Sequence, residues 1–206
     1  TSGAPTTTPT QITSFGSGLY AVDVDAGWAQ TCAVINDGRV MCWGQGSNGR
    51  LGTGNSFQQT TPTFTASLGT DRYAKQVVQG GGHGCAVIDD GTVKCWGSGI
   101  STGTGGTSDV FTPTTTDSLG AGRTAHALIA GTGHVCAILD DATMTCWGHG
   151  GLGRLGNGAT DNQLSPVPVI TTGVPQYWQV SDFLVDPDNR DFRPVWGSPL
   201  HILGAG

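Results

Sequence analysis

The hydrophobic residues of this chain fall in short runs that are separated by glycine and by polar residues. The runs "YAVDVDAG" from Tyr20, "AKQVVQGG" from Ala74 and "AHALIAG" from Ala125 are typical of β-strands. No segment has a helical period, and no apolar run approaches the roughly eighteen residues that would cross a bilayer. The pattern predicts an all-β protein without a membrane span.

A cysteine-bracketed segment recurs after each of these runs. Its copies read "CAVINDGRVMCWG", "CAVIDDGTVKCWG" and "CAILDDATMTCWG", and their first cysteines lie 53 and 51 residues apart (85 − 32 and 136 − 85). In every unit a proline stands eighteen residues before a glycine, in the pairs Pro9 and Gly27, Pro62 and Gly80, and Pro113 and Gly131. Self-similarity at a fixed period of this length is typical of repeat folds.

A fourth, degenerate copy ends the chain. The tryptophan that follows the hairpins occurs at Trp43, Trp96 and Trp147, and then at Trp196. Val195 replaces the second cysteine of this copy, while Phe183 or Val185 stands near the first, depending on the alignment. We expect one domain over residues 1–206 with repeats at approximately 8–60, 61–111, 112–165 and 166–206, and a Thr/Pro-rich extended leader over 1–10.

The cysteine segment predicts a β-hairpin in a definite register. If Cys32 faces Cys42, paired residue numbers sum to 74, and the loop consists of residues 36–38, Asn-Asp-Gly. Three-residue loops that end in a left-handed glycine are a favoured hairpin connection. The third hairpin has Ala142 in that position, where a left-handed backbone should cost about 1 kcal/mol.

Opposed cysteines in such a hairpin are close enough for a disulfide. The expected pairs are Cys32–Cys42, Cys85–Cys95 and Cys136–Cys146. Structural zinc is disfavoured because the close Cys-x-x-Cys spacing is absent. Repeated disulfides indicate an oxidising compartment, which predicts an extracellular or cell-surface location.

The charge and the glycine-rich segments argue against two classes of protein, those that bind nucleic acids and those that bind nucleotides. Nine basic and fifteen acidic residues give a formal charge of −6 without a cluster of Lys or Arg, which argues against a nucleic-acid partner. Two G-x-G-x-x-G matches, from Gly44 and from Gly148, are followed by no helical segment, so we expect no nucleotide and no other cofactor. The Thr/Pro-rich patches are either sites of O-linked glycosylation or loops and edge strands.

Candidate site residues are few. His83 and His134 recur at a repeat position where the first copy has Gln30, and packing is the favoured interpretation. Trp28, Tyr177 and Trp178 are candidates for a binding face, because exposed aromatic residues favour recognition, although core packing is the favoured interpretation for each taken singly. No Ser, His and acid arrangement indicates catalysis, so we expect no enzyme and no metal centre.

Together, "LIAGTGHVCAI" from Leu128, the recurrent "CWG", and "GRLGTG" and "GRLGNG" from Gly49 and Gly153 resemble the regulator of chromosome condensation repeat in its cysteine-paired, extracellular form. The second copy, "CWGSGISTGTGG", lacks the Arg-Leu-Gly element. The resemblance implies a β-propeller of four-stranded antiparallel blades. Nuclear members exchange guanine nucleotide on a small GTPase and bind chromatin; others are protein-binding platforms, including a secreted inhibitor of β-lactamases.

These features predict a propeller-like array of about four blades, the fourth degenerate, that acts as a non-catalytic extracellular scaffold. An incomplete ring presents unpaired strand edges, which favours a self-assembling filament or coat subunit whose partners are copies of itself. The alternative is a secreted module that binds another extracellular protein or a glycan, as an inhibitor or a lectin does.

Overall fold

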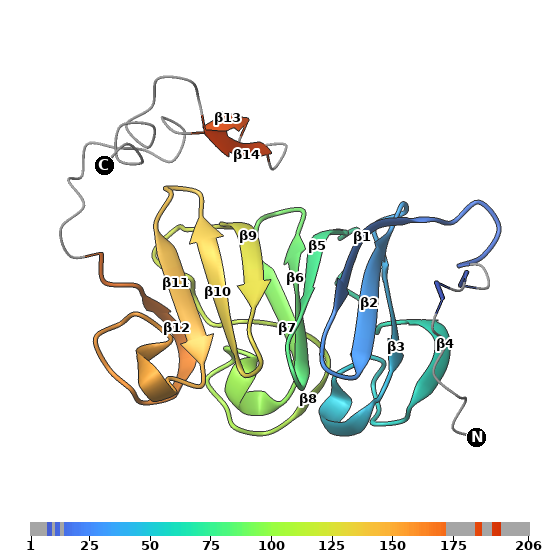
Figure 1. Ribbon diagram of the computed structural model, residues 1–206, viewed down its shortest axis with the longest axis horizontal. Helices are drawn as coiled ribbons and strands as arrows, with labels where there is room; N and C mark the ends of the chain where they lie inside the picture. The colour runs from blue at the N-terminus through green and yellow to red at the C-terminus, as the bar shows by residue number, and fades with distance from the viewer. Residues whose placement is uncertain (1–7, 10, 13–14, 172–183, 187–190, 195–206) are drawn as a thin grey trace.

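The computed structural model describes residues 8–9, 11–12, 15–171, 184–186 and 191–194. Three four-stranded antiparallel sheets stand side by side (Figure 1). The first sheet contains β1 (Ala21–Ala26), β2 (Gln30–Ile35), β3 (Val40–Gly44) and β4 (Gln59–Phe64). The second contains β5 (Ala74–Gln79), β6 (His83–Ile88), β7 (Val93–Gly97) and β8 (Val110–Thr115). The third contains β9 (Ala125–Ala130), β10 (His134–Leu139), β11 (Met144–Gly148) and β12 (Gln163–Pro168).

Strands follow one another in sequence order within each sheet, as in the blades of a propeller. Each third strand leads into a short 3₁₀ segment, and these are η1 (Ser47–Gly49), η2 (Gly99–Ser101) and η3 (Gly151–Gly153). The proline-bearing segments form the fourth, outer strands, where a missing N–H does least harm. The structure therefore has the all-β, propeller-like fold that the repeats predict.

The hairpins have the predicted register. Cys32 lies opposite Cys42 and Val34 opposite Val40, and the same pairing recurs in the second and third sheets. Disulfides join Cys32–Cys42, Cys85–Cys95 and Cys136–Cys146, as the sequence predicts. Gly38 and Gly91 have positive φ angles of 84° and 80°, and Ala142 has one of 64°. The third hairpin thus places an alanine in the left-handed region.

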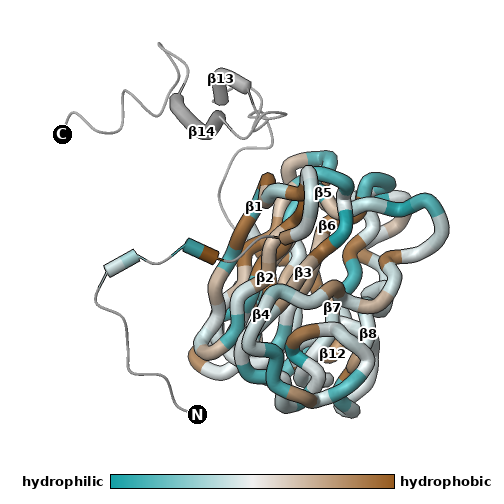
Figure 2. Tube along the Cα trace, turned by 90° about the vertical axis from the view of Figure 1, so that its right-hand side faces the viewer, coloured by the Kyte–Doolittle hydropathy of each residue, from teal (hydrophilic) through white to brown (hydrophobic). Residues whose placement is uncertain are grey.

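Hydrophobic side chains between neighbouring sheets form the core. Val34, Val40 and the first disulfide pack against Val77, Ile88 and Trp96 of the second sheet. An equivalent cluster joins the second sheet to the third, with Val87, Val93 and the second disulfide facing Leu128 and Trp147. In Figure 2 the hydrophobic positions lie along the strands of this body, and the hydrophilic ones gather in the loops. The first and second disulfides therefore each face the following sheet.

Side chains of the first strand in one sheet also bond the first strand of the next. Asp23 and Asp25 accept hydrogen bonds from the backbone N–H groups of Val77 and Gln79, at 2.9 and 2.7 Å. The Gln76 amide pairs with both the N–H and the C=O of Leu128. These bonds fix the position of adjacent sheets along their shared edge.

The two outermost faces of the array differ. Phe15 and Leu19 pack over Ile35 and Met41 on the free face of the first sheet, so that these two side chains are buried. On the free face of the third sheet, Ile129 is 70% exposed and Met144 is 40% exposed. Val40 and Val93, at the repeat position of Met144, are each only 1% exposed because the next sheet covers them.

Most of the predicted fourth repeat and of the leader lies outside the described residues, including Trp196, Tyr177 and Trp178. Of this repeat the structure describes an antiparallel pair, β13 (Leu184–Asp186) and β14 (Asp191–Pro194), after the end of β12. No helix in the described part of the chain is long and apolar enough to cross a membrane.

Candidate functional site

The sheets have two chemically different ends. We call the end formed by hairpin loops 36–38, 89–91 and 140–142 the hairpin end, and the opposite end, with the β1–β2, β5–β6 and β9–β10 turns and the three 3₁₀ segments, the loop end (Figure 1). Carboxylates and arginines of the hairpin end pair with one another, as in Arg72 with Asp89 and Asp90, and Arg123 with Asp141. Its charges are therefore largely neutralised within the fold.

At the loop end, the repeat glycines make room for a side chain from their own turn. A Cβ atom on Gly27 would lie 2.6 Å from Nε2 of Gln30, and one on Gly80 would lie 2.1 Å from Cε1 of His83. The same close approach joins Gly131 to His134, at 2.2 Å. Close packing thus explains why the unit has glycine at this position.

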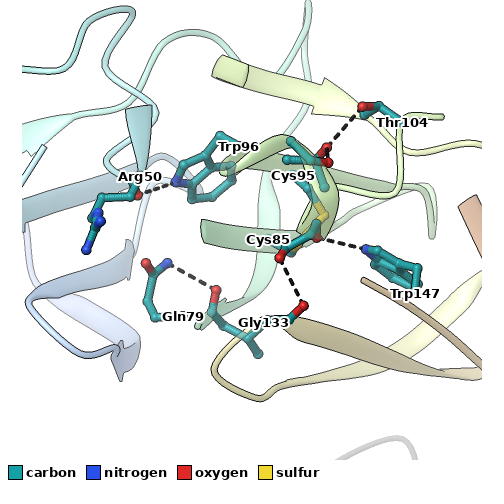
Figure 3. The surroundings of a disulfide bond; sticks show 12 residues. Arg50, Gln79, Cys85, Cys95, Trp96, Thr104, Gly133 and Trp147 are labelled. Atoms are coloured by element: carbon teal, nitrogen blue, oxygen red, sulfur yellow. Dashed lines mark hydrogen bonds between the residues drawn. A yellow bond between two sulfur atoms is a disulfide. The ribbon is translucent and has the colours of Figure 1, made fainter. Parts of the chain in front are cut away.

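Arg50 ties the first sheet to the second at this end. Its guanidinium Nη1 donates a 2.9 Å hydrogen bond to the carbonyl of Gly81, and Nε donates to the carbonyl of Ser47. The carbonyl of Arg50 accepts a 2.9 Å bond from the indole N–H of the buried Trp96 (Figure 3). Burial lowers the pKa of Arg50, although a guanidinium stays charged in proteins.

Ser101 takes the place of Arg50 between the second and third sheets. The indole N–H of Trp147 donates to the Ser101 carbonyl at 3.1 Å, as the indole N–H of Trp96 does to the carbonyl of Arg50 (Figure 3). The short Ser101 side chain donates to the carbonyl of Gly133 at 3.0 Å. The second repeat lacks the Arg-Leu-Gly element, so a hydroxyl occupies the position of a guanidinium.

This replacement adjoins a groove of about 360 Å³, which we call the loop-end groove. Its lining comes from all three sheets and consists of Trp28, Asn48, Arg50, Gly81, Gly82, His83, Ser98, Ser101, Thr132, Gly133 and His149. A neighbouring hollow of about 320 Å³ shares Thr132, Gly133 and His149 and adds Arg154. Of the described residues, none with a carboxylate lines either hollow, although the whole chain has a formal charge of −6.

His83 is one of the buried polar residues that line the groove. Its side chain is fully buried, and neither ring nitrogen has a hydrogen-bond partner within the described ranges. Desolvation, with smaller effects of His134 and His149, lowers the pKa of His83 to about 4, so the ring is neutral at pH 7. Gln30, at the same repeat position, instead donates a 2.8 Å bond to the carbonyl of Gly80. His83 thus lacks a contact that its counterpart makes.

Two large hydrophobic side chains stand exposed at the loop end. Trp28, on the rim of the groove, is 81% exposed. Leu152 of η3 is 95% exposed and has a φ of 64°, in the left-handed region. Asn48 occupies the same position in η1 with a φ of 61°, and asparagine tolerates that conformation far better than leucine does. Leu152 therefore bears a backbone cost and buries almost none of its side chain.

Two of the carboxylates at this end are bound to other groups. Asp109 accepts from the Asn48 amide and the Gly99 N–H, and Asp25 accepts from the N–H groups of Gln79 and Ala26. Among the residues that the structure describes, no three His, Cys or acidic side chains are grouped as a metal ion requires. The arrangement offers aromatic, cationic and neutral donor groups to a ligand.

Models of the regulator of chromosome condensation (RCC1) repeat match residues 37–87 and 21–50. The chain belongs to the RCC1 repeat family. The Arabidopsis thaliana ultraviolet-B receptor UVR8 is 34% identical over 168 residues, covering 80% of this chain and 38% of UVR8. The human E3 ubiquitin-protein ligase HERC2 is 31% identical over 195 residues, covering 91% of this chain and 4% of HERC2. The chain thus spans less than two fifths of either relative.

Solved RCC1-type structures show the same fold. Prp20p from Saccharomyces cerevisiae superposes with a TM-score of 0.65 at 19% identity, over 72% of this chain and 38% of Prp20p. Human WBSCR16 superposes with a TM-score of 0.71 at 22% identity, over 82% of this chain and 44% of WBSCR16. The RCC1 repeats of this chain therefore fold as propeller blades.

The site unites residues that the sequence singled out with residues that it did not. Trp28 and His83 line one groove, whereas His134 does not, and Trp43 packs near Phe15 with ring centroids 6.3 Å apart. Arg50, Ser101, His149 and Leu152 were not predicted as site residues. The available signals were the missing Arg-Leu-Gly of the second repeat, and a leucine at the position of Asn48.

Proposed function

We propose that this RCC1-repeat protein is a non-catalytic binding module that works outside the cell and recognises a partner protein at its loop end. The observation that carries the proposal is the exposure of Leu152, which is 95% exposed in a left-handed conformation. Strained backbone conformations cluster at functional sites, where a residue is retained for its role in binding even though it lowers the stability of the fold. A partner that buries Leu152 would compensate for that cost.

The two hollows at the loop end have the composition of a protein interface. Tryptophan and arginine are enriched among residues that dominate binding energy, and Trp28, Arg50 and Arg154 line the two adjoining hollows. Prp20p, which shares the fold, binds Gsp1p and histones. A sugar ligand would suit Trp28, but it would gain little from the aliphatic Leu152. These features favour a protein over the glycan alternative.

The three disulfides support the extracellular part of the proposal. Each joins the middle strands of a sheet, and two of them lie in the cores between sheets. Such bonds persist in oxidising surroundings and are rare in the cytosol. Mass mapping of cysteines in protein taken directly from its source would test this: alkylation of all six as free thiols contradicts the extracellular assignment.

Binding at the loop end is tested by capturing extracellular proteins of the source on immobilised variants and quantifying the proteins retained. Trp28→Ala and Leu152→Asn should each lose a protein that the unmodified chain retains. Tyr73→Ala is the control, because Tyr73 is 50% exposed and contacts the Gly38 loop at the hairpin end. Retention that is insensitive to both loop-end substitutions would contradict the proposal.

The free face of the third sheet favours a second candidate function, assembly of copies of the chain. This face holds a hollow of about 340 Å³ lined mainly by apolar side chains, among them Ile129, Ile138 and Met144. On the first sheet, Val22 and Val24 are 58% and 62% exposed, so a second copy also offers apolar side chains. Contacts between unlike faces continue into filaments unless the rotation closes.

Light scattering over a concentration series tests self-assembly. The unmodified chain should gain mass with concentration, and Ile129→Asp should remain monomeric because it places a charge on the exposed face. Deletion of residues 1–12 tests whether the leader takes part in the contact. A monodisperse monomer at every concentration for the unmodified chain would rule this candidate out.

A further inference from the structure

We propose that the loop-end groove is a carboxylate site that receives an aspartate or glutamate side chain of the partner. This inference rests on the proposed function for its ligand, a side chain of a partner protein. The observations that support it come from the groove alone, and its test does not need the partner. Trp28, which lines the groove, contributes contact area, whereas the polar lining residues supply hydrogen-bond donors.

The first observation is the unsatisfied imidazole of His83. Buried polar groups in native proteins nearly always have hydrogen-bond partners, and an exception calls for a ligand or another explanation. Both ring nitrogens of His83 are buried and without a partner in the described part of the chain, and the side chain lines the groove. A neutral imidazole has one N–H to donate, and a carboxylate oxygen accepts it.

The second observation is the set of further donors in the same groove. Arg50 uses Nη1 and Nε in bonds to the carbonyls of Gly81 and Ser47, while Nη2 makes no hydrogen bond to a described residue. The His149 side chain is exposed, and its backbone N–H bonds the carbonyl of Gly133. Charge-assisted hydrogen bonds from such groups are roughly twice as strong as neutral ones.

The third observation is the absence of competing carboxylates. No acidic residue that the structure describes lines the groove, and Asp25 and Asp109 at the loop end bond Gln79, Asn48 and Gly99. At the hairpin end, by contrast, arginines pair with carboxylates of the same chain. The arginine of the groove is therefore available to an acidic group from outside.

The geometry favours a carboxylate over a dianion such as phosphate. The groove contains one guanidinium, one neutral imidazole and one exposed imidazole, and the chain as a whole has a formal charge of −6. Phosphate sites in proteins usually gather several cationic groups or backbone N–H groups at a helix N-terminus. The donors present here are sufficient for a single negative charge.

The test is an NMR titration of protein labelled with ¹⁵N at histidine. The probes are the tripeptide acetyl-Gly-Asp-Gly-amide, its asparagine counterpart and inorganic phosphate. The aspartate peptide should shift the His83 ring signals saturably, and the asparagine peptide should not. Because a hydrogen bond to a charged group contributes about 1.5–3 kcal/mol, Arg50→Gln should weaken binding by tenfold or more.

His83→Gln and His134→Gln form a matched pair of variants. Each introduces the residue that the first repeat has at that position, where Gln30 is compatible with the fold. The first should weaken aspartate binding, followed through the His149 ring, by tenfold or more, whereas the second should leave it unchanged because His134 does not line the groove.

Three outcomes would overturn the carboxylate site. They are equal binding of the aspartate and asparagine peptides, tighter binding of phosphate, and undiminished binding by His83→Gln. None of these would affect the separate test with Trp28→Ala and Leu152→Asn, so failure of the carboxylate site is distinguishable from failure of the proposed protein binding.

Discussion

The two interfaces between sheets are built on one plan and differ where Arg50 is replaced by Ser101. In both, a fully buried tryptophan donates its indole N–H to the carbonyl at that position, at 2.9 Å from Trp96 and 3.1 Å from Trp147. In the first interface a guanidinium spans the gap to the next turn, and in the second a hydroxyl does. The hydrogen bond from the tryptophan to the backbone is thus the same in both interfaces, whereas the second interface lacks the long side chain of Arg50.

This difference shows how a repeat protein can acquire a site without changing its fold. Leu51 and Leu155 are fully buried beside the two arginines, and Thr102 takes the equivalent place in the second repeat with hydrogen bonds to Gly99 and Thr104. Removal of an Arg-Leu pair from one unit therefore changes the surface next to the groove and leaves the tryptophan contact unaltered.

The largest expected effect tests whether the two interfaces are equivalent in their cores. Trp96→Ala and Trp147→Ala should each lower the free energy of unfolding by about 3–5 kcal/mol, because both indoles are fully buried. Denaturant unfolding measures both. A much smaller cost for Trp147→Ala would show that the second interface is not built like the first.

The next effect concerns His83 and pH. An unfolded histidine takes up a proton below its usual pKa of about 6.5, whereas His83 stays neutral in the folded protein until about pH 4. Since the unfolded state binds more protons in this window, stability should fall as the pH drops from 6.5 to 4, by up to about 3 kcal/mol.

Unfolding free energies of His83→Gln across this window measure the effect. The substitution should remove most of the slope that the unmodified protein shows between pH 6.5 and 4. His134→Gln should remove less, because that side chain is only partly buried and its pKa is lowered without a large shift. Equal slopes for the unmodified protein and His83→Gln would contradict the burial of a neutral ring.

A smaller effect is expected when the first interface is given the residue of the second. Arg50→Ser removes the hydrogen bond to the carbonyl of Gly81 and should cost about 1–3 kcal/mol. Arg154→Ser is the control, since Arg154 bonds only Gly151 of its own segment among the described residues. If both substitutions cost the same, the Arg50 contact does not join the sheets.

The smallest expected effect concerns the hairpin turns, which lie at the opposite end of the sheets from the groove. Ala142→Gly should raise stability by some tenths to about 1 kcal/mol, because φ at this position is 64°. Gly91→Ala in the second hairpin should be clearly destabilising, since its Cβ would lie 2.5 Å from Cβ of Thr124. Thermal unfolding of the two variants should therefore move in opposite directions, and a loss of stability in Ala142→Gly would contradict the left-handed assignment.

The repeat made much of the fold predictable. Residues that recur at constant spacing have the same local geometry. The register derived for the first hairpin therefore predicts the disulfides of the other two and the left-handed conformation of Ala142. The groove could not be worked out in this way, because it depends on contacts between copies. The sequence shows that the second repeat lacks Arg-Leu-Gly, but not that Arg50 reaches Gly81 across an interface.

The site also depends on burial, which the repeat does not reveal. His83 and His134 look alike in the sequence, yet His83 is fully buried and lines the groove, while His134 is only partly buried and does not line it. The difference arises from the neighbouring sheets, whose loops contribute different side chains. Leu152 could not be singled out from the sequence either, because its backbone strain is evident only from its φ angle.

The central claim is that the short side chain of Ser101 leaves open a groove that binds a carboxylate. Ser101→Gln tests it most directly, because glutamine fills the space at the Gly133 carbonyl without adding charge. The measurement is the dissociation constant of acetyl-Gly-Asp-Gly-amide, read from the His83 ring signals of the unmodified and substituted proteins. We predict at least tenfold weaker binding. Binding as tight as that of the unmodified protein would contradict the account.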